Sequence, residues 1–389
     1  MTRTLFELPH GPLGVAVGYQ HRRERLSYDY NADANAHRFA LVIGGEDFDV
    51  DQMVNAGFVE LSAPVIDGLE LQAALRYEDF GGGVNTWDPK IGVLVQPLST
   101  VSLRATYGTS FRAASLFQKN GTLVVPARVF DPVNNAQVTV SQRTGADPDN
   151  PLVPQTATTY NFGATWDADL GLNLSIDYWS FAYDDYITAQ SPGEVVAAAP
   201  VGPQVIRTVA NQIATVRTFF QNAGSLDTDG VDLSARFRLP QSGLGQFTLS
   251  ASATRVISYD LTDPQRGRID GLGNRNFLNF GVSMPKLRGN AGVEWTTGTH
   301  SANVFVRYID SYRDDSDANY EIKAFTTVDV QYSLDLPPDF FAGIAPAITV
   351  GCRNLFDEDA PDALDRTGYD PLVANPLGRL VYASISAQF

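Results

Sequence analysis

Side chains alternate between two faces in segment after segment of this chain, and the alternation continues to its last residue. In the segment 380–389, one face carries Val381, Ala383, Ile385, Ala387 and Phe389. The other face carries Leu380, Tyr382, Ser384, Ser386 and Gln388. A period of two residues is the signature of a half-buried β-strand. The pattern therefore predicts a strand that runs to an aromatic C-terminal residue.

The same alternation recurs in roughly fourteen segments of about ten residues, the length at which a tilted strand crosses a bilayer. Leu71, Leu103, Leu233 and Val330 are typical members of the apolar faces. No run of about 18 apolar residues occurs, which excludes a transmembrane helix. We predict an all-β protein, a transmembrane antiparallel meander whose apolar face meets hydrocarbon and whose polar face meets a wet interior.

The predicted connections alternate in length. Short links with turn residues are predicted at 64–68, 97–100, 167–171, 240–245 and 296–299. Long links fall between them at 24–51, 111–156, 189–223, 258–285 and 356–376. Short turns on one side of a membrane and long loops on the other are typical of outer-membrane β-barrels. Long connections at every second link are uncommon in compact soluble domains.

Aromatic residues near the strand ends could form girdles at the two membrane interfaces. The candidates are Tyr77, Tyr107, Tyr178, Trp179, Trp295 and Tyr308. Aromatic residues also occur at strand ends of soluble sheets, so this pattern supports the membrane prediction less strongly than the loops do.

The composition argues against several function classes. Lys and Arg total 28 against 44 Asp and Glu, a formal net charge of -16, whereas nucleic acids attract basic surfaces. The single cysteine, Cys352, and four scattered His residues predict neither a disulfide nor a metal cluster. The chain has no nucleophile elbow of a hydrolase and no phosphate loop before a helix. We expect no cofactor and no enzymatic activity.

The start of the chain lacks an apolar segment of the kind that directs export. Glu7, Pro9 and His10 interrupt the first residues before such a segment can develop. A protein of the outer membrane needs an export signal. We therefore expect that the chain lacks its natural N-terminus.

Several stretches resemble the C-terminal part of the barrel of TonB-dependent outer-membrane receptors. They are Tyr107–Leu116, with Ala114 where Pro is usual; Asn150–Tyr160, with Gln155 in place of an acidic residue; Asn354–Asp357 after the strand Ile348–Arg353; and Gly378–Arg379 before the last strand. The stretch 14–24 is similar to a barrel strand well inside that family's chains. The resemblance extends from about Pro12 to Phe389, with the motifs in order and at suitable spacing.

The resemblance implies a barrel of about 22 strands around a plug domain, with the fourteen predicted strands as its C-terminal part. Residues 1–389 would then lack the signal peptide, the plug, the TonB box and the first strands. The implied function is TonB-energised uptake of a scarce nutrient (a siderophore, a vitamin or a saccharide) across the outer membrane of a Gram-negative bacterium. The implied partners are outer-membrane lipid and lipopolysaccharide, the small-molecule ligand, and a TonB-type complex that contacts the missing plug region. Alone, the chain is expected to be inactive.

Polar residues on the strands should point into the lumen, because an arginine at mid-depth on the lipid face costs about 2–4 kcal/mol. The candidates for lining a substrate path are Arg104, Arg112, Arg236, Arg238, Asp329 and Arg353. The same residues could instead bond to the plug or to one another. Arg112 could also pair with carboxylates of the loops.

Other polar clusters have a simpler interpretation as turns or loops. Asn354–Asp357 would end a strand, because Asn and Asp bond to nearby backbone groups. The acidic residues of the segment 314–321 could hold a divalent cation that bridges lipopolysaccharide, but a solvated loop is the simpler hypothesis. Cys352 is expected to pack against lipid or a neighbouring residue.

Two alternative functions also fit the alternation. One is a self-contained, fourteen-stranded passive channel of the outer membrane. The other is a soluble extracellular β-protein that binds glycans. A dry globular core around Leu71, Leu103, Leu233 and Val330 would contradict the membrane prediction.

Overall fold

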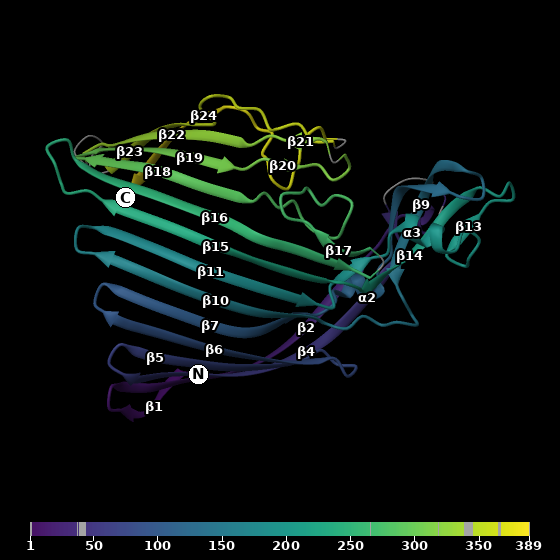
Figure 1. Ribbon diagram of the computed structural model, residues 1–389, viewed down its shortest axis with the longest axis horizontal. Coiled ribbons are helices and arrows are strands. Elements are labelled where there is room, and N and C mark those ends of the chain that lie inside the picture. The colour runs from purple at the N-terminus through teal and green to yellow at the C-terminus, as the bar shows by residue number, and fades with distance from the viewer. Residues whose placement is uncertain are drawn as a thin grey trace.

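The computed structural model describes residues 2–36, 38, 44–264, 266–317, 319–337, 345–364 and 367–388. Most of the regular structure in these ranges is β-strand, in two main sheets (Figure 1). Short helices lie in the connections: α1 (Ala32–Asn35), α2 (Leu116–Asn120) and α3 (Pro192–Ala198). None of the helices in the described ranges has the length and apolar character needed to span a membrane. The predicted all-β class is confirmed.

The larger sheet is an antiparallel meander. Along its path lie β1 (Thr2–Leu8), β2 (Gly11–Tyr28), β4 (Phe48–Ile66), β5 (Leu69–Asp79), β6 (Asn85–Leu98), β7 (Val101–Arg112), β10 (Gln155–Ala168), β11 (Leu172–Asp184), β15 (Ser225–Arg238), β16 (Gln246–Asp263), β18 (Leu287–Thr297), β19 (His300–Ile309), β22 (Phe325–Asp335), β23 (Ala345–Arg353) and β24 (Leu380–Gln388). β17 (Gly267–Asp270) pairs with the end of β16. Neighbours in this sheet therefore follow chain order, as a meander requires.

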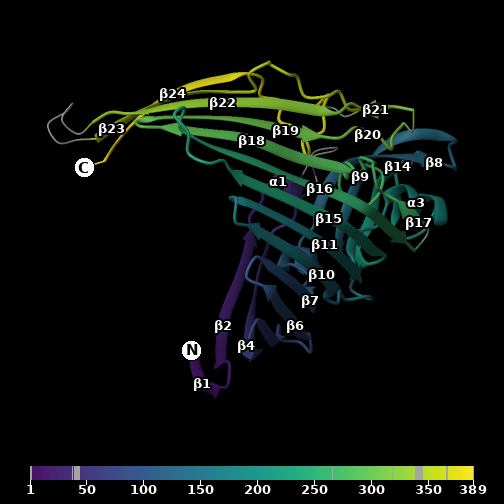
Figure 2. The ribbon, with the colours of Figure 1, turned by 60° about the vertical axis from the view of Figure 1, so that its left-hand side comes forward.

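The sheet has 16 strands in the described ranges when β17 is included, against roughly fourteen expected from ten-residue alternation. One strand that the sequence does not reveal is β1, whose seven residues are too few to show a clear period. The sheet is curved, and β1 and β24 lie at opposite edges (Figure 2). Within the described residues no pairing joins these two strands. Phe389 lies outside the described residues.

The strand registers place most of the alternating aliphatic residues of the long strands on one face. Leu103 pairs with Val95 and Ala164 on its two sides, and Leu233 pairs in the same way with Ile176 and Ala253. We call this the apolar face, and the opposite one the polar face.

The apolar face is not a dry core. Leu71, Leu103 and Leu233 are 40%, 43% and 49% exposed, and Val330 is half-buried. These exposures contradict the alternative of a soluble protein with these residues in its centre.

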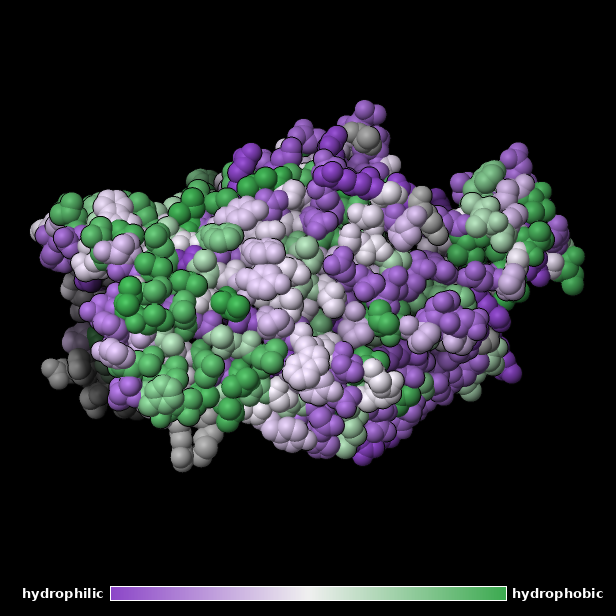
Figure 3. All heavy atoms as spheres, turned by 60° about the horizontal axis from the view of Figure 1, so that its bottom comes forward, coloured by the Kyte–Doolittle hydropathy of each residue, from purple (hydrophilic) through white to green (hydrophobic). Residues whose placement is uncertain are grey.

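Toward the long loops, the apolar face becomes charged. Arg23 pairs with Asp51 at 2.9 Å, and Arg25 pairs with Asp49, on the same face as Val17 and Val59. Figure 3 shows a hydrophobic area over part of the molecule, which gives way to hydrophilic residues toward the projecting sheet at the right. β2 and β4 have 18 and 19 residues, whereas about 9–11 cross a bilayer. The strands are therefore long enough to continue beyond a membrane.

Most of the predicted girdle residues lie on the apolar face. The ring of Tyr77 lies 4.6 Å from that of Trp87, and the ring of Tyr107 lies 5.2 Å from that of Tyr160. Trp179 was assigned wrongly, since it lies on the polar face. There it packs over Gly230 and against a buried cluster that includes Leu226.

Trp179 belongs to a set of aromatic side chains that cover glycines of the neighbouring strand on the polar face. The other pairs are Phe58 over Gly18, Phe305 over Gly292 and Tyr382 over Gly351. A Cβ added at Gly292 would lie 2.8 Å from Cε1 of Phe305. An aromatic ring placed over a strand glycine compensates for the missing side chain and helps to fix the register.

The predicted alternation of short and long links is confirmed. β4 to β5, β6 to β7, β10 to β11, β15 to β16 and β18 to β19 are joined by short turns. The long links lie at the other ends of these strands, with one exception. β5 and β6 are joined on that side by only the residues 80–84, which include three consecutive glycines with positive φ.

A second, six-stranded sheet forms from three of the long links. Its strands are β3 (Gly44–Gly45), β8 (Leu123–Asp131), β9 (Ala136–Ala146), β12 (Ile187–Ala189), β13 (Val205–Arg207) and β14 (Ile213–Asn222). β9 and β14, which come from different links, pair in parallel. We call this sheet with α3 the outer platform; it projects from one end of the large sheet (Figure 1).

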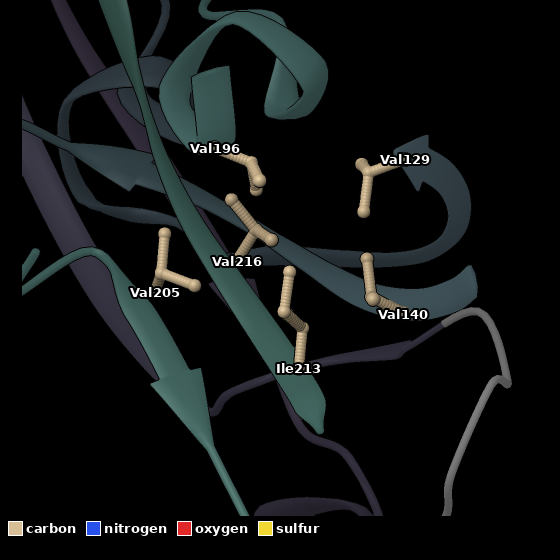
Figure 4. Close-up of a cluster of buried hydrophobic side chains, with 6 residues drawn as sticks. All are labelled: Val129, Val140, Val196, Val205, Ile213 and Val216. Atoms are coloured by element: carbon tan, nitrogen blue, oxygen red, sulfur yellow. The ribbon is translucent and has the colours of Figure 1, made fainter. Parts of the chain in front are cut away.

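The outer platform has a dry core of its own (Figure 4). Its buried side chains are Val129, Val140, Val196, Val205, Ile213 and Val216. Asp131 and Arg207 form a buried ion pair beside them, with Oδ1 and Nη2 2.7 Å apart. These segments were predicted to be long links, and this core was not predicted.

Candidate ligand pathway along the polar face

The loops fold over the polar face, which identifies it as the interior face. Lys119 of α2 donates a hydrogen bond of 3.0 Å to Oε1 of Gln52 on β4. Phe280 and Met284, from the link before β18, pack against the buried residues Leu226 and Leu261 of β15 and β16. The polar face, on which the predicted lumen-lining side chains lie, is therefore the face that the outer loops cover.

Arg104 lies on the polar face and bonds across a strand. Its Nε donates to Oδ1 of Asp177 at 2.9 Å, and Nη2 donates to the other carboxylate oxygen. Gly163 stands between them, paired in register with both residues. The absence of a side chain at this glycine leaves room for the guanidinium group to reach from β7 to β11.

Arg112 is at the outer-loop end of β7. Its Nε donates to Oε1 of Gln155 at 2.6 Å, and Gln155 is buried. Gln155 is the position where the resemblance leads one to expect an acidic residue. The hydrogen-bond partner of Arg112 is thus an amide of the neighbouring strand β10 and not a carboxylate of a loop.

Arg236 and Arg238 lie at the short-turn end of β15. Nη2 of Arg236 is 3.8 Å from Oε2 of Glu294, and both side chains are well exposed. The backbone N–H of Arg238 donates to the carbonyl of Gly171 at 2.9 Å, which continues the pairing of β15 with β11. These two arginines are far along the strands from the loops that cover the other candidates.

Asp329 and Arg353 lie near the outer-loop ends of β22 and β23. Asp329 bonds to Arg307 through Oδ2 and accepts the backbone N–H of Asn354 through Oδ1 at 2.9 Å. The side chain of Arg353 has neither a hydrogen bond nor an ion pair to another described residue. It lines a cavity of about 430 Å³ together with Arg307 and Asp329.

Sequence reasoning missed a charged network at the outer end of β2, β5 and α2. Glu78 is buried and accepts from Nε of Arg76 at 2.6 Å and from Nη2 of Arg22 at 3.2 Å. Arg22 also bonds to Glu24 at 2.8 Å. Arg76 and Glu78 share the polar face of one strand, which the alternation in the sequence shows. Their distant partner Arg22 could not be found from the sequence.

The acidic segment 314–321 is not a simple solvated loop. Asp314 is fully buried and accepts from Nη1 of Arg275 at 3.1 Å and from the backbone N–H of Leu364 at 2.9 Å. Nearby, Asp370 accepts from Oγ of Ser283 at 2.6 Å. These bonds join three outer links into one cluster.

Tyr312 belongs to the same cluster and donates to Asp370 at 2.8 Å. Burial raises the pKa of Tyr312 well above the ordinary value of a phenol, and the bond to Asp370 raises it further. The described residues contain no group of three or more His, Cys, Asp and Glu side chains placed to hold a metal ion.

The Asn354–Asp357 stretch ends a strand, as predicted. Both residues have positive φ, 49° and 59°. Oδ1 of Asn354 accepts the N–H of Glu358 at 2.9 Å, and Oδ1 of Asp357 accepts the N–H of Arg379 at 2.6 Å. Their side chains are occupied by the backbone of the last outer link.

A larger hollow of about 730 Å³ lies mainly against residues of the apolar face. Its lining includes the small residues Ala251 and Ala291 and the larger residues Trp166 and Ile176. Its lining belongs to the face that we assign to hydrocarbon. It is therefore separate from the polar pathway.

Comparison with known families decides the classification. Residues 2–355 match the family described as TonB dependent receptor-like, beta-barrel. The chain belongs to this family. Its members are outer-membrane β-barrel proteins of Gram-negative bacteria and transport receptors, not a class of enzymes. The resemblance seen in the sequence and the predicted transmembrane meander are confirmed.

Solved receptors share the fold. A mutant of the ferric enterobactin receptor of Pseudomonas aeruginosa has 16% identity and a TM-score of 0.71, with 99% of this chain and 53% of the receptor covered. The siderophore receptor PirA of Acinetobacter baumannii has 16% identity and a TM-score of 0.65, with coverages of 98% and 52%. The FrpB iron transporter of Neisseria meningitidis has 14% identity and a TM-score of 0.57, with coverages of 99% and 54%.

The chain spans about half the length of these solved receptors. A search of the curated proteins gave no match.

Proposed function

We propose that residues 1–389 form the C-terminal part of the barrel of a TonB-dependent receptor, which takes up a ferric siderophore across the outer membrane. The observation that carries the proposal is the curved antiparallel sheet with an apolar outer face and a loop-covered polar face. The ligand class comes from the solved relatives, which are described as siderophore or iron receptors.

The remaining strands, a plug and a TonB-contact segment would lie on the part of the receptor that this sequence does not include. Two features support this part of the proposal. The polar face carries many charged groups that a plug could contact, among them Arg104, Arg236 and Arg238. In addition, β1 and β24 are edge strands of the described sheet, and unpaired edges are costly in lipid. The chain alone would not transport.

Uptake by the full-length receptor tests the proposal. Its gene, extended by the flanking DNA, would be expressed in an iron-starved bacterium that lacks its own siderophore receptors. We expect accumulation of radioactive iron supplied as a ferric siderophore, and its loss in a strain without TonB. Uptake that continues without TonB would favour the passive channel.

A further inference from the structure

We propose that the cavity between β19, β22, β23 and the last outer link binds a small organic monoanion, through a carboxylate held by Arg353. The cavity measures about 430 Å³, and small-molecule sites in proteins typically measure about 300–1,000 Å³. One wall is the polar face of the three strands. The rest of the lining includes residues of the last link, among them Asn375 and Leu377.

Among the side chains that line this cavity, one positive group has no counter-ion. Arg307 and Arg353 contribute two positive charges and Asp329 one negative charge, so the balance is one positive charge. Both carboxylate oxygens of Asp329 are already used, by Arg307 and by the backbone N–H of Asn354. Among the described residues, no side chain pairs with Arg353.

The remaining lining determines which anion would fit. Phe325 is buried, whereas Leu377 and Leu380 are 69% and 48% exposed and present apolar surface toward the cavity. A ligand with a carboxylate at one end and an apolar body at the other would satisfy both parts. The planar guanidinium group of arginine matches a carboxylate with two parallel hydrogen bonds.

The site deepens the proposed function and rests on it, because it lies on the face that we assign to the ligand pathway. Arg353 is the last residue of β23, and the long link follows directly. The cavity is therefore at the outer-loop end of the polar face. A ligand that arrives from outside would meet this wall early.

Calorimetry on the whole 389-residue chain, refolded in detergent, tests the site with benzoate as the probe. We expect saturable binding of benzoate, and binding of the neutral isostere benzamide at least about tenfold weaker, since charge-assisted hydrogen bonds are the stronger ones. Arg353→Gln should weaken benzoate binding by a similar factor. Arg353→Lys keeps the positive charge but not the planar guanidinium group. Its affinity for benzoate should lie between that of the unchanged chain and that of Arg353→Gln.

Arg128→Gln is the matched control, because it removes an exposed arginine of the outer platform, on β8, outside the cavity. It should leave benzoate binding unchanged. The circular dichroism of each refolded variant establishes that the sheet is intact before titration. Equal binding of benzoate and benzamide, unchanged binding by Arg353→Gln, or no saturable binding by the intact chain would each overturn the site.

The two proposals fail separately. Absence of TonB-dependent iron uptake by the full-length receptor would overturn the proposed function, and it would not alter a calorimetric result obtained on the chain. Absence of benzoate binding would overturn the anion site, and it would not alter a positive result for siderophore uptake.

Discussion

Val140 and Val216 of the outer platform are 1% and 0% exposed, whereas Leu103 and Leu233 of the large sheet are 43% and 49% exposed. All four are aliphatic residues on β-strands. In the platform, α3 covers the valines and supplies Val196 to their core. No second layer covers the leucines in the described residues, because they belong to the face assigned to lipid. Strand alternation therefore identifies an apolar face, but it does not identify the medium that contacts this face.

The largest expected difference between the two sheets comes from truncation of a buried side chain. Ile213→Ala in the platform should cost about 2–5 kcal/mol, because it removes contacts in a packed core and leaves a cavity. Leu233→Ala on the apolar face should cost less, since lipid can fill the space. Hydrogen exchange of the segments around each residue measures both effects. Equal loss of protection at the two sites would remove the distinction.

An arginine on the apolar face should also be costly. Leu233→Arg should destabilise the folded protein in a bilayer by about 2–4 kcal/mol, whereas Ser234→Arg, one position along and on the polar face, should have a small effect. Reversible urea titration in lipid vesicles gives both free energies of unfolding. A large cost for Ser234→Arg with none for Leu233→Arg would show that the faces are reversed.

The platform should respond to acid through its buried ion pair. The hydrogen bond from the Arg207 guanidinium holds the pKa of the Asp131 carboxyl well below its ordinary value. Weaker hydrogen bonds from other groups lower this pKa further. In the unfolded chain the carboxyl takes up a proton near pH 3.9, the usual value for Asp. The stabilisation is therefore complete above about pH 4 and decreases as the pH falls below it.

Limited proteolysis of the platform between pH 6 and pH 3 measures this response. Cleavage within the segment 123–146 should increase on acidification, and Asp131→Asn should make cleavage at pH 6 faster and less dependent on pH. The large sheet, probed in the same samples, serves as the internal control. A platform whose resistance is the same at both pH values would contradict the role of the pair.

The smallest expected effect concerns the glycine beneath an ion pair of the large sheet. A Cβ at Gly163 would lie 2.6 Å from Nε of Arg104 and would also meet Asp177, so Gly163→Ala should break the pair. The cost should be on the order of 1 kcal/mol or less, as for other solvent-accessible pairs. Gly57→Ala is the control, because its Cβ would be 3.9 Å from the nearest atom. Urea titration in vesicles compares the two, and a larger cost at Gly57 would argue against the pair.

Much of the large sheet was predictable because its information is local. Alternation around Leu71, Leu103 and Leu233 identifies the strands and their faces, and turn residues such as those at 167–171 mark the short links. The family resemblance followed from motifs of the same local kind. Five candidate lining residues were named from alternation, and the sixth, Arg112, from its place after Phe111. Arg104, Arg112, Asp329 and Arg353 lie on the polar face beside the residues described above.

The outer platform was not predictable in the same way, because its pairing is not local. Thr144 and Thr218 pair in parallel strands although 74 residues separate them. Asp314 looked like part of a solvated acidic loop, but residues from two other links bury it. The partner of Arg112 depended on register, which brings Gln155 opposite it. Such contacts depend on how distant segments meet, and a single sequence does not contain that information in readable form.

The assignment of the two faces can be tested directly with spin labels at successive positions from 231 to 236 on β15, in the full-length receptor reconstituted in lipid with Cys352 replaced. Oxygen concentrates in hydrocarbon, and a water-soluble nickel complex stays in the aqueous phase. We expect high accessibility to oxygen at 231, 233 and 235 and high accessibility to nickel at 232, 234 and 236. Uniform accessibility along the strand, or maxima at the opposite positions, would contradict this assignment.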